Sequence, residues 1–142
     1  MTKIDPALKS ALQRLEASSH SWKDRLSKRI AELGVVFAED YPGKNLSARS
    51  VDSFVLFLDL LPRSPDYPDV TATPAGDIYA EWRRVNGRHF TIEVLDSGEA
   101  RWLVLSPNPR HPERVDRLTG STTADALGEA IAPLARLTGV AA

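Results

Sequence analysis

Apolar residues recur every three or four positions through the N-terminal part of the chain, which is the spacing of an amphipathic helix. The polar run at residues 18–21 interrupts this pattern, and Ser21 with Asp24 resembles a capping box. We therefore predict two helices, or one kinked helix, that meet near Ser21 and end at Gly34, because glycine favours the position after a helix end. The two apolar stripes consist of Leu8, Leu12 and Leu15, and of Trp22, Leu26, Ile30 and Leu33.

A further helix is predicted after a connector at residues 35–45, which contains turn-forming Pro, Gly and Asn. Ser47 is a typical N-cap residue, and the helix that it begins runs to about Leu61, before Pro62. Apolar residues cover nearly all sides of this helix, so we expect it to be buried on more than one face. Phe54 and Leu58 are its expected central core residues.

Three glycines, Gly76, Gly87 and Gly98, lie at equal intervals of eleven residues and separate short segments of alternating pattern. Each glycine fits the last position of a three-residue hairpin loop, where φ is positive and glycine is the residue that adopts it most readily. The spacing therefore predicts three successive hairpins, and with them a four-stranded antiparallel meander over residues 69–106.

The register of these hairpins follows from the faces on which apolar residues fall. The Asn-Gly pair in the second turn also suits a two-residue turn, but that register would place Trp82 opposite Thr91 and separate the apolar residues of the two strands. Three-residue loops instead place Trp82 opposite Phe90 and collect the apolar residues on one face. The pairs on that face are Ala72–Ile78, Val70–Ala80, Ile78–Val94, Ala80–Ile92, Trp82–Phe90, Val94–Ala100, Ile92–Trp102 and Phe90–Val104.

The opposite face of the predicted sheet is mostly polar. Leu103 and Leu105 are its apolar exceptions, so they either lie under a helix or contact a partner. If their strand is also a sheet edge, its unpaired backbone could bind another chain. The polar face consists of the rows Thr71–Tyr79–Glu93–Arg101, Asp69–Glu81–Thr91–Leu103 and Arg83–His89–Leu105.

Residues 107–121 are predicted to form a loop, because they contain three prolines, and this loop is locally basic. Apolar residues at helical spacing then predict a C-terminal helix over residues 122–138, with a kink near Pro133. The predicted fold class is α+β, with N-terminal helices, a four-stranded antiparallel meander and a C-terminal helix. We expect a single domain over residues 1–142, in which 1–34 form a helical arm and 46–106 a helix plus sheet.

Composition and charge narrow the function classes. The 142 residues contain 18 Lys and Arg against 19 Asp and Glu, a formal net charge of −1, which does not favour a dedicated nucleic-acid-binding protein. Cysteine is absent, so disulfides and cysteine nucleophiles are excluded. The sequence shows neither a signal peptide nor an apolar run long enough to span a membrane, so we expect a cytoplasmic protein without membrane contact.

Sequence motifs for catalysis are not evident. The three histidines lack metal-ligand spacing, and neither a Gly-x-Ser-x-Gly motif nor a phosphate-binding loop occurs. Glu81 and Glu93 share the polar sheet face, but Arg101 beside Glu93 argues against a general-acid role there. We therefore predict a non-enzymatic protein and assign no catalytic residue, metal or cofactor.

The span from about Leu46 to Val104 resembles small, mostly uncharacterised bacterial accessory proteins. The shared features are the capped apolar helix that begins at Ser47, a proline-rich link, and the strand motif Gly-x-Ile-x-x-Glu-Trp at residues 76–82. Such proteins often carry a Trp-Asp-Gly motif before the helix, whereas this chain has Ala-Glu-Asp-Tyr-Pro-Gly at residues 38–43. The resemblance implies an accessory protein, in some cases encoded beside toxin-like genes, and implies no catalytic residues.

Two hypotheses for function follow. The first is a non-enzymatic protein-interaction module of antitoxin, immunity-protein or inhibitor type, with a protein as partner and a homodimer as a compatible form. The alternative is a nucleic-acid-associated accessory protein that uses a basic helix at residues 23–29 and a basic loop at residues 110–117. The candidate partner-binding residues are Tyr79, Arg83, Arg101, Leu103 and Leu105 on the sheet, Lys23, Arg25 and Arg29 on the helix, and Arg110 and Arg114 in the loop.

Overall fold

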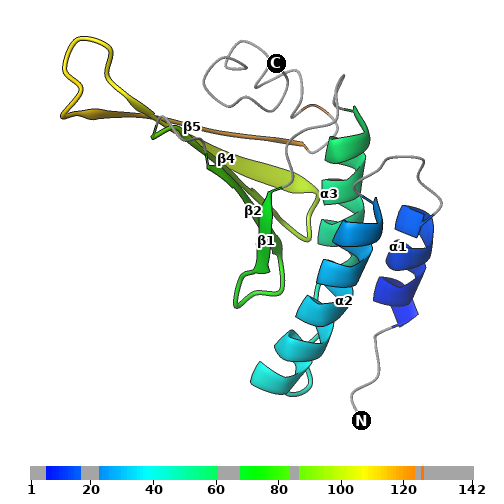
Figure 1. Cartoon of the computed structure of the whole chain (residues 1–142). Coiled ribbons are helices and arrows are strands. Elements are labelled where there is room, and N and C mark those ends of the chain that lie inside the picture. The colour runs from blue at the N-terminus through cyan, green and yellow to red at the C-terminus, as the bar shows by residue number, and fades with distance from the viewer. Residues whose placement is uncertain (1–5, 17–22, 61–67, 84–86, 124–125, 127–142) are drawn as a thin grey trace.

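The computed structural model describes residues 6–16, 23–60, 68–83, 87–123 and 126. In this part of the chain, three helices are followed by five strands (Figure 1). The helices are α1 (Pro6–Glu16), α2 (Lys23–Asp40) and α3 (Ala48–Leu60). The strands are β1 (Asp69–Ala72), β2 (Ile78–Arg83), β3 (His89–Val94), β4 (Glu99–Pro107) and β5 (Val115–Thr123).

The strands form one antiparallel sheet in the order β1-β2-β3-β4-β5, so each strand pairs with its neighbour in sequence. The predicted register is confirmed across the first three hairpins, with Trp82 opposite Phe90 and Ile92 opposite Trp102. The burial argument therefore selected the correct register over the two-residue turn. The three turn glycines have the predicted positive φ, with values of 87° at Gly76, 79° at Gly87 and 89° at Gly98.

β5 shows that the predicted fold class is wrong in its C-terminal part. The sheet has five strands rather than four, and β5 occupies residues assigned to the loop 107–121 and to the start of the C-terminal helix. Nearly all β5 side chains are exposed, so the strand lacks the apolar alternation that marks a half-buried strand. Its pairing with β4 over nine residues determines its conformation. Apart from Ala126, the rest of the range 124–138 lies outside the described residues.

α2 continues to Asp40, so the predicted helix end at Gly34 is wrong and only residues 41–45 of the predicted connector 35–45 lie outside a helix. Gly34 lies inside the helix because α1 approaches it closely. A Cβ at Gly34 would lie only 3.0 Å from Cδ2 of Leu8. The glycine therefore provides space for helix packing rather than a helix end, and the chain after α2 reaches Ser47 through a shorter turn with a positive φ at Gly43.

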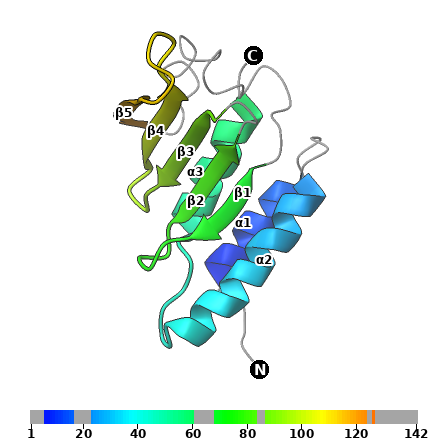
Figure 2. The same cartoon turned by 60° about the vertical axis from the view of Figure 1, so that its left-hand side comes forward.

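α3 begins as predicted, because Oγ of Ser47 accepts a hydrogen bond of 3.0 Å from the amide of Ser50. Phe54 and Phe57 are fully buried, and Leu58 is nearly so. α3 packs against β2 and β3 on one side and against α1 on another, which confirms the expectation of burial on more than one face. Figure 2 shows α3 behind the sheet and α2 alongside β1, while one buried cluster includes residues from all three helices and from β1 to β4.

Candidate functional site

The sheet face that points away from α3 contains a depression of about 580 Å³ that extends from β2 to β5. We call this surface the outer face. Its lining includes three apolar or aromatic residues, two arginines and several hydroxyl or carboxyl groups. Among them are Tyr79, Glu93, Arg101, Leu103, Arg117 and Thr119.

Leu103 occupies the middle of this depression, because the register places it between Thr91 on β3 and Thr119 on β5. Leu103 and Tyr79 are both half-buried, so part of each side chain faces solvent. Leu105 lies one row further along, between His89 and Arg117, and is also half-buried. The outer face therefore presents an apolar centre within polar surroundings.

The charged residues of the depression face one another without forming ion pairs. Arg101 lies opposite Glu93 across β3 and β4, as predicted, but no ion pair joins them in the described structure. Arg117, on β5, likewise has no carboxylate partner among the described residues. Asp77 lies nearby and is buried. Its burial is the largest cause that raises the pKa of Asp77 above its ordinary value of 3.8, and the charge of Glu93 is the next largest. Both arginines of the depression are available to a partner.

β4 is not a sheet edge, so the condition under which its backbone could pair with another chain is not met. β5 pairs with β4 over nine residues, from Glu99 opposite Thr123 to Pro107 opposite Val115. No described helix covers Leu103 or Leu105, since α1, α2 and α3 pack on the other face or at the β1 edge. The two leucines therefore lie in the interior of the outer face, and β5 takes the edge position.

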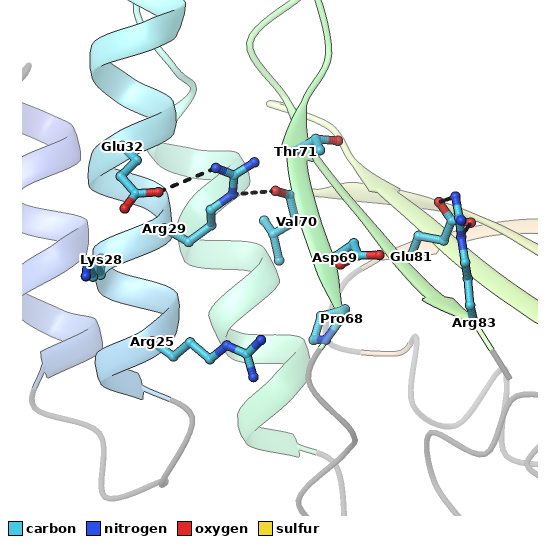
Figure 3. Close-up of a pocket in the computed structure, with 10 residues that line it drawn as sticks. All are labelled: Arg25, Lys28, Arg29, Glu32, Pro68, Asp69, Val70, Thr71, Glu81 and Arg83. Carbon is cyan, nitrogen blue, oxygen red and sulfur yellow. Dashed lines mark hydrogen bonds and ion pairs between the residues drawn. The ribbon is translucent and has the colours of Figure 1, made fainter. Parts of the chain in front are cut away.

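A second groove, of about 620 Å³, lies between α2 and β1 (Figure 3). Arg25 and Arg29 extend from α2 toward β1, whereas Arg83 lies on the far side of the strand. Lys28 on α2 also lines the groove, so it contains four cationic residues. Three acidic residues, Glu32, Asp69 and Glu81, balance most of this charge.

Arg29 and Arg83, which are predicted docking cations of this groove, form specific contacts within the chain. Nε of Arg29 donates a hydrogen bond of 2.9 Å to the Val70 carbonyl, and its Nη1 lies 3.5 Å from Glu32 (Figure 3). Nε of Arg83 donates a bond of 2.6 Å to Glu81, which raises the pKa of the Arg83 guanidinium above its ordinary value. These contacts indicate that Arg29 covers the β1 edge and that Arg83 is paired along the outer face.

The basic loop predicted at residues 110–117 lies at the end of the β4–β5 hairpin, which projects away from the helices (Figure 1). Asn108 orders this end: its Oδ1 accepts hydrogen bonds from the amides of Arg110 and His111, at 2.9 Å and 3.0 Å. Its backbone amide also donates to the carbonyl of Arg114. Arg110 and Arg114 are both exposed on this ordered turn.

The structure thus divides the ten predicted site residues into separate groups. Tyr79, Arg101 and Leu103 share the outer-face depression, with Leu105 in the adjacent row. Arg25, Arg29 and Arg83 line the α2–β1 groove, and Lys23 begins α2. Arg110 and Arg114 lie at the hairpin end. The sequence analysis missed Arg117 and Thr119 as outer-face residues, because their strand was assigned to a loop.

Within the described residues, no group of three or more His, Asp or Glu side chains has the geometry of a metal site. Among the described helices, α1 to α3, none is long and apolar enough to cross a bilayer.

Comparisons with family models, with curated proteins and with solved structures find no match to this chain. The resemblance to bacterial accessory proteins is therefore a hypothesis from sequence motifs alone.

Proposed function

We propose that the protein is a non-enzymatic interaction module that binds another protein through the outer face of its sheet. The observation that carries this proposal is the depression around Leu103, on the sheet face opposite α3. A depression that combines half-buried apolar and aromatic side chains with polar groups is typical of a protein-binding site. An antitoxin, immunity protein or inhibitor would act in this way, by occupying a partner's surface.

The residue types of the depression support a protein partner. Tyrosine and arginine are enriched among the residues that dominate binding energy in protein interfaces. Tyr79 offers a ring and a hydroxyl, and Arg101 offers a guanidinium with no ion pair in the described structure. A partner that covers Leu103 and supplies hydrogen-bond acceptors to Arg101 would bury the apolar centre inside a polar rim.

Cross-linking in the native host tests this proposal. A photoreactive amino acid in place of Leu103 should form a covalent product with one partner protein, which mass spectrometry identifies. The same photoreactive amino acid in place of Val36 should form no such product. Val36 is a suitable control because it is 51% exposed on α2, away from the outer face. Leu103→Asp should leave the protein folded and abolish capture of that partner by a second cross-linker at Tyr79. A folded Leu103→Asp variant that captures the partner normally would contradict the proposal.

The alternative function, nucleic-acid binding, is favoured by one observation. Arg110 and Arg114 lie on a projecting two-stranded ribbon, a shape that the major groove of DNA admits. The other half of this hypothesis, the basic helix 23–29, receives less support because Arg29 is bonded to the Val70 carbonyl. Binding to a DNA duplex of about 20 base pairs should then weaken steeply with salt, and Arg110→Glu with Arg114→Glu should reduce it. Unchanged binding in that double variant would exclude the ribbon as the DNA-binding element.

A further inference from the structure

β5 presents a sheet edge that differs from the edge on the other side of the sheet. β1 has only four residues, and Arg29 of α2 donates a hydrogen bond to its Val70 carbonyl. β5 has nine residues and, in the described part of the chain, pairs with β4 alone. The N–H and C=O groups on the other side of an edge strand are a template on which another chain can pair.

Features that usually prevent such pairing are sparse on β5. Proteins protect edge strands with proline, inward charges or lysine, or keep the edge strand short. Residues 115–123 contain neither proline nor lysine. All of these residues except Gly120 and Thr122 are exposed, and Val115 and Leu118 are 63% and 45% exposed. The edge is therefore long, accessible and partly apolar.

The charges along this edge indicate what kind of chain would pair with it. The nearby carboxylates are already engaged: Nδ2 of Asn108 lies 3.1 Å from Oδ1 of Asp116, and Nδ1 of His111 lies 3.6 Å from Glu113. Arg117 on β5 and Arg114 just before it have no carboxylate partner among the described residues. The edge consequently offers two guanidinium groups to an acidic chain.

We propose that the edge of β5 that has no strand partner in the described part of the chain binds an extended acidic segment of a partner protein as a sixth strand of the sheet. This inference rests on the proposed function and specifies the partner. Backbone hydrogen bonds to β5 would provide affinity, and a carboxylate opposite Arg117 would provide selectivity. A second copy of this chain is a poorer occupant, because β5 supplies a single carboxylate, Asp116, which Asn108 already holds.

A synthetic probe tests strand addition directly. The probe is a fluorescein-labelled peptide of about eight residues in which threonine and glutamate alternate, so that carboxylates project on one face of an extended chain. Fluorescence anisotropy with the full chain at low salt measures its affinity. Two further peptides serve as controls: one with glutamine in place of glutamate, and one with N-methyl groups at alternate residues, which removes the backbone donors of one edge.

The expected result is binding of the glutamate peptide with new hydrogen-exchange protection at β5 amides, and loss of binding for both control peptides. Arg117→Glu should weaken affinity by up to about fivefold, the upper end of the ratio that corresponds to one cross-strand charge pair. Arg49→Glu is the matched control, because Arg49 is exposed on α3, away from β5, and this variant should bind normally.

Four outcomes would overturn the inference. If the N-methylated peptide binds as tightly as the glutamate peptide, charge attraction and not strand pairing explains the binding. The same conclusion follows if Arg49→Glu weakens binding as much as Arg117→Glu. A concentration-dependent dimer with protected β5 amides, and no peptide binding, would assign the edge to a second copy. A monomer that does not bind the peptide would exclude an acidic strand. If Leu103 still cross-links to a partner in these last two cases, the proposed function stands and only the strand-addition inference fails.

Discussion

The indole ring of Trp102 lies over Gly120, its cross-strand partner on β5. A Cβ at residue 120 would overlap the Cζ2 and Cε2 atoms of the ring and lie 2.8 Å from its Nε1. Glycine inside a strand often marks such a close approach. The absence of a side chain on β5 at this one position therefore allows the large ring on β4 to occupy the space that a Cβ would fill.

Gly120→Ala should destabilise the protein by about 1–3 kcal/mol, because the added methyl group must displace the Trp102 ring or the β5 backbone. Urea unfolding measures the loss, and Thr119→Ala, an exposed neighbour on the same strand, is the control. In combination with Trp102→Leu the penalty of Gly120→Ala should become smaller, since the overlapping ring is gone. Strictly additive effects would show that the two residues do not interact.

The middle of the fold could be predicted from sequence because burial and turn chemistry agreed there. A shift of one residue in the hairpin at Gly87 would have moved every apolar side chain to the other face, so a single register satisfied both constraints. The same reasoning placed Tyr79, Arg101 and Leu103 on the outer face, where the structure shows a depression. Strong alternation in β1 to β4 supplied the necessary information.

The errors arose where a residue's local preference was overruled by a neighbour distant in sequence. Glycine usually ends a helix, but Gly34 lies within α2 because Leu8 of α1 packs against it. The prolines of residues 107–121 suggested a loop, whereas most of this range pairs with β4 and Gly120 accommodates Trp102 within a strand. β5 carries almost no apolar pattern, so only its pairing with β4 identifies it. For the same reason, Arg117 could not be placed beside Leu103 in advance.

Ser50 is a buried polar residue of α3 that joins the helix to the sheet. Its hydroxyl donates a hydrogen bond to the Val94 carbonyl and accepts one of 2.8 Å from the Ile78 amide. Ile78 and Val94 are partners in the β2–β3 ladder, so the hydroxyl bonds to both backbones at the end of that ladder. Removal of the hydroxyl would leave a buried donor and a buried acceptor without this partner.

Ser50→Ala should therefore reduce the free energy of unfolding by about 1–3 kcal/mol, the cost of leaving buried polar groups unsatisfied. The control is Ser53→Ala on the same helix, which is only partly buried and should have a much smaller effect. Hydrogen exchange should also accelerate at the Ile78 amide. An unchanged stability in Ser50→Ala would mean that water replaces the hydroxyl without cost.

The hydrogen bond from Arg29 to the Val70 carbonyl is inferred to protect the β1 edge, and a substitution at Arg29 tests this role. Arg29→Met retains much of the aliphatic side chain but removes the donor, and should cost about 0.5–1.5 kcal/mol. Amides of β1 should exchange faster with solvent than in the wild type. Lys28→Met, which lines the same groove without a bond to β1, is the control. If both variants have the same stability and the same β1 exchange rates, the hydrogen bond of Arg29 does not protect the β1 edge.

Asp77 makes the stability of the fold depend on pH. Its carboxyl group is buried and close to Glu93, so its pKa in the folded protein lies above the ordinary value of 3.8. The folded protein thus holds this proton at pH values where the unfolded chain has released it. The contribution of Asp77 is most favourable below pH 3.8 and is lost as pH rises through the folded pKa.

Asp77→Asn removes this ionisation while it keeps a side-chain oxygen that can accept the hydrogen bond from the Asp96 amide. Relative to the wild type, the variant should gain stability as pH rises from about 3.5 to 7, because the wild type alone must bury a charge. Urea unfolding at a series of pH values measures this difference. Asp40→Asn, an exposed carboxyl at the end of α2, should show no comparable gain. A variant that instead loses stability relative to the wild type toward neutral pH would show that the fold stabilises the Asp77 carboxylate, which would reverse the assigned direction.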